Sequence, residues 1–278
     1  MQTPPSSRLA GAQGITDASA PVIAFDRASK HFTAPNGQDL EVLSDVSFTV
    51  PAGEIVAILG QSGAGKSTLL NMASGLITPD YGCVRVLGTD TRKNVDWRRV
   101  GYMFQDDRLL PWRVASKNVA LALETTAVPS AERRRRSQAA LDLVGLGDFA
   151  DNYPHELSGG MRSRVALARS LVGEPDVLLM DEPFSRLDAQ TRGVMHRELL
   201  RIQSLRRVSI LLVTHDVEEA AVLADRIVLL SPRPGRVRKI IDISLEHPRT
   251  GKPETVALTA ELRALLEAAN PANPKEIA

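Results

Sequence analysis

Residues 60–67 read Gly60-Gln61-Ser62-Gly63-Ala64-Gly65-Lys66-Ser67, and this stretch decides the fold. Its glycines let successive backbone N–H groups turn toward one point, where they bind phosphate oxygens. The spacing predicts that Lys66 reaches the terminal phosphates, that the Ser67 hydroxyl ligates Mg²⁺, and that Thr68 assists at the phosphate. A glycine-rich turn with a stray lysine is the alternative, and the flanking sequence decides against it.

Strand-like and helix-like segments alternate on both sides of this loop. Residues 55–59 form a continuous apolar run, as a buried strand does, and residues 67–74 are helix formers that place a positive helix end at the loop. Further apolar runs with strand character occupy residues 22–25, 42–50, 177–180, 210–213 and 227–230. Strands separated by helical segments predict an α/β protein with a largely parallel sheet.

The middle and the two ends of the chain differ from this pattern. Residues 106–160 carry loose helical periodicity, which predicts a helical insert within a core of residues 21–245. We interpret residues 1–20 as a flexible tail. Residues 246–278 are expected to form a partly helical tail, with Leu258, Leu262, Leu265 and Leu266 on one helix face.

Composition excludes several classes of protein. The chain has 278 residues, a formal net charge of +1, 43% hydrophobic and 24% charged residues, all ordinary for a globular protein. This charge balance favours no nucleic-acid partner. A single cysteine excludes an internal disulfide, and no apolar run approaches membrane-span length, so any membrane attachment is expected to come through partner subunits.

Two acidic residues follow the run at residues 177–180. Asp181 and Glu182 are expected at the C-terminal end of a core strand, which is the edge where open α/β sheets bind ligands. Asp181 would hold Mg²⁺, and Glu182 would polarise an attacking water. A pair of surface acids closing a strand is the alternative, and the neighbouring phosphate loop disfavours it.

The sequence Leu157-Ser158-Gly159-Gly160-Met161 resembles the signature loop of ATP-binding-cassette ATPases, which often have Gln in place of Met161. The resemblance implies the ATP-binding-cassette fold, with its P-loop core, an antiparallel β portion and the helical insert. It also implies two copies packed head to tail. In that arrangement the signature loop of each copy caps the ATP on the other copy's P-loop. The capping residues are Ser158, Gly159, Gly160 and Met161. The P-loop residues that would bind the ATP are Gly60, Gln61, Ser62, Gly63, Ala64, Gly65, Lys66, Ser67 and Thr68.

Further positions match the family in order. Gln105 resembles the glutamine that contacts Mg²⁺ and the hydrolytic water, and His215 resembles the histidine that contacts the γ-phosphate. Residues 185–188 resemble the loop that crosses the dimer interface, although Arg186 replaces a more usual Ala. Phe32 resembles the aromatic residue that stacks on adenine. Taken alone, His215 and Phe32 would more often be structural residues.

A finer resemblance, to nitrate, sulfonate and taurine importers, rests on residues 104–112 and 231–236. It implies an ATPase subunit that uses ATP and Mg²⁺ at the cytoplasmic face of the cell membrane. Its partners would be transmembrane permease subunits and, indirectly, a solute-binding protein. The Leu-Leu-Pro-Trp stretch at residues 109–112 is interpreted as an exposed docking patch or as an ordinary turn. The run of four basic residues at 133–136 is interpreted as a solvated helix face or a contact with lipid headgroups. An exporter or lipid-transport cassette and a non-transport ATP-driven switch remain the functional alternatives.

Overall fold

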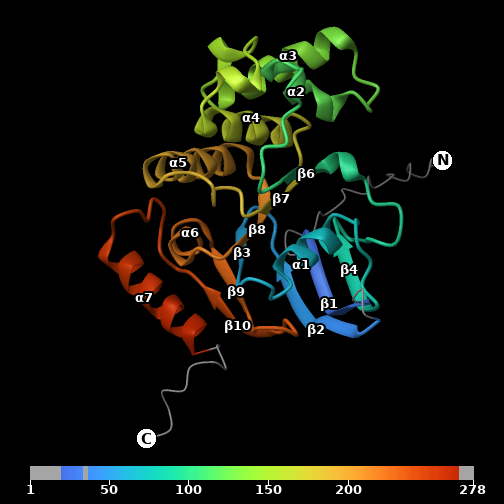
Figure 1. Ribbon diagram of the computed structural model, residues 1–278, viewed down its shortest axis with the longest axis vertical. Coiled ribbons are helices and arrows are strands. Elements are labelled where there is room, and N and C mark those ends of the chain that lie inside the picture. Colours follow the sequence, from blue (N-terminus) through green and yellow to red (C-terminus); the bar gives the residue numbers. More distant parts are fainter. Residues whose placement is uncertain (1–19, 34–36, 269–278) are drawn as a thin grey trace, which may run out of the picture.

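The strands form two sheets in this computed structural model, which describes residues 20–33 and 37–268 (Figure 1). The expected tail at residues 1–20 lies outside the described residues except for its last position, and so do residues 269–278. No helix in the described ranges combines the length and the apolar character that crossing a bilayer requires.

The larger sheet is parallel except at one edge. Its strand order is β10-β9-β3-β8-β7-β6, and only the pair of β10 and β9 is antiparallel. The strands are β3 (Ile55–Leu59), β6 (Val100–Met103), β7 (Val177–Asp181), β8 (Ser209–Thr214), β9 (Arg226–Leu230) and β10 (Val237–Asp242). The expectation of a largely parallel sheet is therefore confirmed.

The smaller sheet is antiparallel throughout. Its order is β2-β1-β4-β5, with β1 (Ile23–Thr33), β2 (Asp39–Val50), β4 (Tyr81–Val86) and β5 (Thr89–Asp90). The end of β2 alternates between exposed and buried residues, because one face of the strand packs on the core while the other meets solvent.

The helices fall into three groups. Helix α1 (Lys66–Ala73) follows β3 directly, and α2 (Ala115–Ala120), α3 (Ser130–Leu143) and the start of α4 (Gly159–Leu171) belong to the upper lobe of Figure 1. The other helices are α5 (Ala189–Arg206), α6 (Val217–Leu223) and α7 (Pro253–Glu267). Short 3-10 helices are η1 (Trp97–Arg99), η2 (Leu121–Leu123), η3 (Gly147–Phe149) and η4 (Pro154–Glu156). The helix expected around Leu258 is present as α7.

Two hydrophobic cores cover opposite faces of the larger sheet. In β3, Val56 and Ile58 point toward α1 and the smaller sheet, whereas Ile55, Ala57 and Leu59 point toward the helices on the other face. Alternate side chains of one strand point to opposite faces, so a strand buried on both sides is apolar at every position. This packing holds the loop between β3 and α1 at the sheet's C-terminal edge.

The exposed patch expected at residues 109–112 is only partly present. Leu109 is buried in the core of the helical lobe, so that part of the prediction is wrong, because the segment folds back and Asn118 fixes its backbone. Pro111 and Trp112 are exposed, Trp112 at 72% of its surface.

Candidate nucleotide site

The P-loop joins β3 to α1 and wraps around the side chain of Lys66. Gly65 precedes the helix with φ 92°, and a Cβ at Gly65 would lie 2.6 Å from Leu43, so this position requires glycine. The Lys66 ammonium is 6% exposed and donates to the Gly60 and Gln61 carbonyls at 2.9 and 3.0 Å. The lysine is therefore held against the loop in which phosphate is expected to bind.

The acidic pair lies beside the loop at the end of β7. Ser67 Oγ donates to Asp181 Oδ1 at 3.1 Å. Glu182 has φ 43°, a conformation that residues other than glycine adopt at a cost, and its N–H donates to the Val213 carbonyl at 2.9 Å. This strained turn directs the Glu182 carboxylate between two cationic or proton-bearing groups.

Those groups are Lys66 and His215. Lys66 Nζ lies 3.8 Å from Glu182 Oε1, and His215 Nδ1 lies 3.0 Å from Glu182 Oε2. The structure thus brings together three residues that are far apart in the sequence. Glu182 sits at the centre of the three, with 19% of its side chain exposed.

Burial shifts the charge balance of the site. It lowers the pKa of Lys66, although the nearby carboxylates of Glu182 and Asp181 oppose the shift. Burial likewise raises the pKa of Asp181, and its hydrogen bond from Ser67 opposes that shift. Both charged forms therefore gain from a ligand that supplies opposite charges, as a metal–nucleotide complex does.

Ser67 and Asp181 fit a magnesium ion, since hydroxyl and carboxylate oxygens are the ligands Mg²⁺ prefers. The described residues contain no group of three or more His, Cys, Asp and Glu side chains that could hold a metal by itself, so nucleotide oxygens and water would complete the shell. Gln105 is held differently. Its Nε2 donates to Ser185 Oγ at 3.4 Å, and that hydroxyl donates to the Glu182 carbonyl at 2.9 Å.

A cavity of 390 Å³ opens in front of the P-loop. Phe32 contributes an exposed ring, 39% accessible, at one part of its wall, while P-loop residues form another. The lining residues are Phe32, Leu40, Val42, Ser62, Gly63, Gly65, Lys66, Ser67, Thr68, Glu182 and Arg233. An apolar part with an aromatic ring and a part rich in donors suit a base and a phosphate chain respectively.

The signature residues Ser158, Gly159, Gly160 and Met161 are not among those that line this cavity. They form the first turn of α4, where Ser158 Oγ accepts a hydrogen bond from Met161 N at 3.3 Å. A Cβ at Gly160 would lie 2.6 Å from Thr191, so Gly160 allows α4 to approach α5 closely. Ser158 and Gly159 are exposed. One chain alone therefore does not bring its signature turn to its own P-loop.

Sequence reasoning missed three cavity residues, Leu40, Val42 and Arg233. Leu40 and Val42 lie on β2, and Arg233 lies in the loop between β9 and β10. The stretch around Arg233 carried only a resemblance, and its proximity to the P-loop is a tertiary contact that no local pattern encodes.

The fold and the loop define an α/β protein with a P-loop for nucleotide phosphates at the C-terminal edge of its sheet. The family model described as "ABC transporter" matches residues 43–185. A taurine import ATP-binding protein of Mesorhizobium japonicum is 46% identical over 78% of this chain and 82% of its own length. A nitrate import ATP-binding protein of Synechococcus elongatus is 42% identical over 82% of this chain and 35% of its own length.

Among solved structures, the dimeric post-hydrolysis state of the ATP-binding cassette MJ0796, bound to ADP and Pi, superposes with a TM-score of 0.71. That structure is 30% identical in sequence, and the match covers 81% of this chain and 100% of the other. This chain belongs to the ABC transporter family.

Proposed function

We propose that this chain is the ATP-hydrolysing subunit of an ABC importer and that it couples hydrolysis to uptake of a nitrate-, sulfonate- or taurine-type solute. The observation that carries the ATPase activity is the position of Glu182, between Lys66 and His215 at the mouth of the P-loop cavity. The likeness to import proteins for taurine and nitrate supports the direction of transport and the class of solute.

In this proposal the P-loop amides and Lys66 hold the β- and γ-phosphates. Phosphoryl transfer depends on positioning and charge stabilisation, so the Glu182 carboxylate orients and polarises the attacking water. His215 holds that carboxylate and would face the γ-phosphate, while Gln105 would contact the bound metal ion and the water. Mg²⁺ bound through Ser67 and Asp181 would neutralise charge on the phosphates. Phe32 would stack on adenine.

The proposed assembly contains two copies of the chain. Because Ser158 and Gly159 are exposed and do not line the cavity of their own subunit, each signature turn is free to close the site of the other copy. The N-terminal turn of α4 would then supply N–H groups to the γ-phosphate. The dimeric solved structure of a related cassette supports this arrangement.

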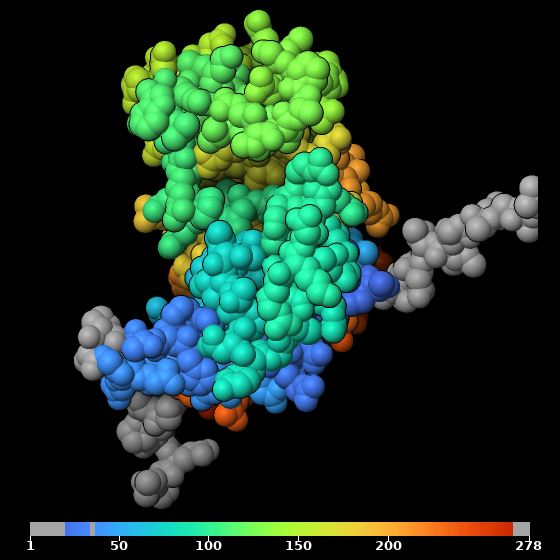
Figure 2. All heavy atoms as spheres, turned by 90° about the vertical axis from the view of Figure 1, so that its right-hand side faces the viewer, coloured from blue at the N-terminus to red at the C-terminus, as the bar shows by residue number. Residues whose placement is uncertain are grey.

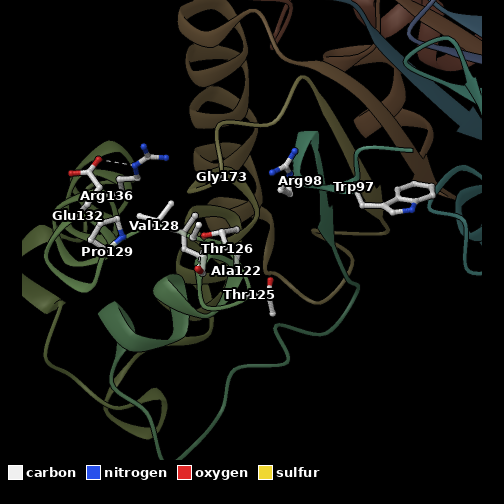
Figure 3. Close-up of a pocket in the computed structure, with 12 residues that line it drawn as sticks. Trp97, Arg98, Ala122, Thr125, Thr126, Val128, Pro129, Glu132, Arg136 and Gly173 are labelled. Carbon is white, nitrogen blue, oxygen red and sulfur yellow. Dashed lines mark hydrogen bonds and ion pairs between the residues drawn. The ribbon is translucent and has the colours of Figure 1, made fainter. Parts of the chain in front are cut away.

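We also place the contact with the permease beside the helical lobe. A cavity of 640 Å³ separates Trp97 and Arg98 from the start of α3, and Figure 3 shows Thr125, Thr126 and Val128 on its opposite wall. In Figure 2 the green helical lobe stands above the teal residues of η1 with a hollow between them. Arg113, next to the exposed Trp112, pairs with Glu124 at 2.6 Å, which joins the Trp112 segment to this wall. The chain would thus be a peripheral protein on the cytoplasmic face of the membrane, held there by the permease.

Substitution of the P-loop lysine tests the ATPase activity. Lys66→Ala removes the cation from the phosphate site, so we expect ATP turnover by the purified protein to fall by about two orders of magnitude or more. Lys93→Ala, at an exposed position outside the cavity, serves as the control and should retain wild-type turnover. Normal turnover of Lys66→Ala would refute the assignment. Solute uptake by vesicles that contain the permease and this chain, driven by ATP on this chain's side, tests the importer.

A further inference from the structure

Arg233 is a cation in the nucleotide cavity that lacks a partner within the described residues. Its side chain lines the cavity beside the P-loop, and Nη2 lies 3.6 Å from the point where a Cβ on Gly63 would stand. The arginine makes no hydrogen bond or ion pair with any residue that the structure describes. Lys66, the other cation of the cavity, already faces Glu182.

The loop that carries Arg233 is fixed to the P-loop's own supports. Gly235 N donates to the Val42 carbonyl at 2.9 Å, and Ser44 N donates to the Gly235 carbonyl at 3.0 Å. A Cβ on Gly235 would collide with the Ala64 carbonyl of the P-loop, so the two loops are in direct contact. The position of Arg233 is therefore tied to the position of the P-loop.

Local chemistry stiffens the same loop. Ser231 Oγ donates to the Pro234 carbonyl and accepts from Arg236 N, both at 3.0 Å. Arg233 stands between Pro232 and Pro234, which fix their own φ angles and restrict the residue before them. Little backbone entropy is left to lose when the side chain binds a ligand, and a preorganised donor binds more tightly than a mobile one.

We propose that Arg233 binds the phosphate chain of the nucleotide beside Gly63 of the P-loop. An unpaired guanidinium beside Gly63 matches phosphate oxygens in charge and geometry, because its planar set of donors binds two oxygens at once. Arg233 is then a binding residue that favours nucleotides with more than one phosphate, whereas Phe32 recognises the base. This inference rests on the proposed nucleotide site.

Binding of ADP and AMP to the purified full chain tests the inference. Competition against a fluorescent ADP analogue gives both affinities without hydrolysis. We expect Arg233→Ala to weaken ADP binding about three- to tenfold, the worth of one charge-assisted hydrogen bond near solvent. AMP has one phosphate fewer than ADP for Arg233 to bind, so the variant should lose less affinity for AMP. The ADP affinity of the variant should also depend less on salt than that of the wild type, because one screened charge pair is gone.

Arg236→Ala is the matched control, since Arg236 is an exposed arginine of the same loop and does not line the cavity. It should bind ADP as the wild type does. Arg233→Lys keeps the charge but not the paired donors, so its affinity for ADP should lie between those of the wild type and Arg233→Ala. Equal ADP affinities of Arg233→Ala and Arg236→Ala would overturn the inference, and so would an equal loss for ADP and AMP. A wild-type chain that binds no ADP would refute the nucleotide site itself.

Discussion

Glu182 holds a left-handed backbone conformation that costs free energy in a residue with a Cβ. A hydrogen bond of the sheet offsets this free energy, because the N–H of Glu182 donates to Val213 and so extends the pairing of β7 with β8. The result is a carboxylate that reaches both Lys66 and His215. A loop without this turn would leave the group free to rotate away from the phosphate site.

Glu182→Gln keeps the shape and the backbone of this residue but removes its charge. We expect ATP binding to persist and turnover to fall by about two to four orders of magnitude, the usual contribution of a positioned base. Since the closed dimer would then persist, size-exclusion chromatography with light scattering should show a dimer in Mg-ATP. Glu174→Gln, at an exposed site away from the cavity lining, should behave as the wild type. Turnover at the wild-type rate in Glu182→Gln would contradict its assigned role.

At the scale of elements, two loops that approach the site are tied to one another. The loop after β6 carries Gln105 and Asp106, and the loop after β7 carries Ser185 and Arg186. Gln105 donates to Ser185, and Arg186 forms an ion pair with Asp106. In the proposed assembly the first loop would lie near the permease and the second at the dimer interface, so this link is suited to carrying a signal between them.

Charge reversal tests that link. Arg186→Asp should change ATP turnover by the assembled transporter several-fold, whereas the thermal midpoint of the isolated chain should hardly move, because exposed ion pairs contribute at most about 1 kcal/mol. The double variant Arg186→Asp with Asp106→Arg restores the pair and should recover turnover in a double-mutant cycle. Reversal of the pair between Arg92 and Asp90, in the small sheet, is the control. If the double variant recovers no ATP turnover, the ion pair between Arg186 and Asp106 does not transmit the signal.

A second link joins the start of β3 to the segment before α7. Asp225 accepts a hydrogen bond from Ile55 N at 2.8 Å, and it faces His247 and the buried Arg249 at 3.4 and 3.7 Å. Desolvation raises the pKa of Asp225, but the hydrogen bonds from His247 and Ile55 together with both charges outweigh it, so the net shift is downward.

Stability should follow this shift. A carboxyl whose pKa is lowered by folding stabilises the folded chain above its unfolded pKa, about 3.9, and that contribution is lost as the pH falls through the folded value. We expect Asp225→Asn to lower the free energy of unfolding, measured by urea titration near pH 7, by about 1–3 kcal/mol, because Arg249 loses its counter-charge. The difference in free energy of unfolding between Asp225→Asn and the wild type should become smaller as the pH falls from about 5 to 3. A difference that stays constant with pH would show that the charge of Asp225 does not contribute to the stability of the folded chain.

The sequence predicted those elements whose pattern lies within one short stretch of the chain, and it missed those that depend on contacts between distant residues. The run of β3, the glycines of the P-loop and the acids after β7 each form a contiguous stretch of the chain, so their place in the fold could be predicted from the sequence. Strands β4, β5, β6 and β10 were missed, because each is short or partly exposed and is stabilised by its neighbours in the sheet. Arg233 was missed for the same reason, since its place at the cavity depends on a contact between residues 64 and 235.

At the scale of the whole molecule, the two lobes carry different parts of the proposed site. The two lobes stand one above the other, and the helical lobe carries the signature turn at the start of α4 (Figure 1). The P-loop cavity belongs to the lower lobe, whereas the 640 Å³ cavity has one wall in the helical lobe. Arg162 and Arg169 of α4 bind Asp107 and the backbone of Arg108 in the loop after β6. These bonds tie the loop after β6 to α4, the helix that begins with the signature turn.

Trp112 gives the sharpest test of where that partner binds. Trp112 is 72% exposed, so its apolar surface is available to an anchor from the permease. Its neighbour Arg113 pairs with Glu124, which lies between the cavity-lining residues Leu123 and Thr125. We expect Trp112→Ala to weaken co-purification with the permease by about tenfold or more while leaving the basal ATP turnover of the isolated chain intact. Tyr81→Ala, which removes an equally exposed aromatic ring from β4 in the small sheet, should leave both unchanged. Lost turnover with intact assembly would place Trp112 in the catalytic lobe's machinery instead, and unchanged assembly would move the docking surface elsewhere.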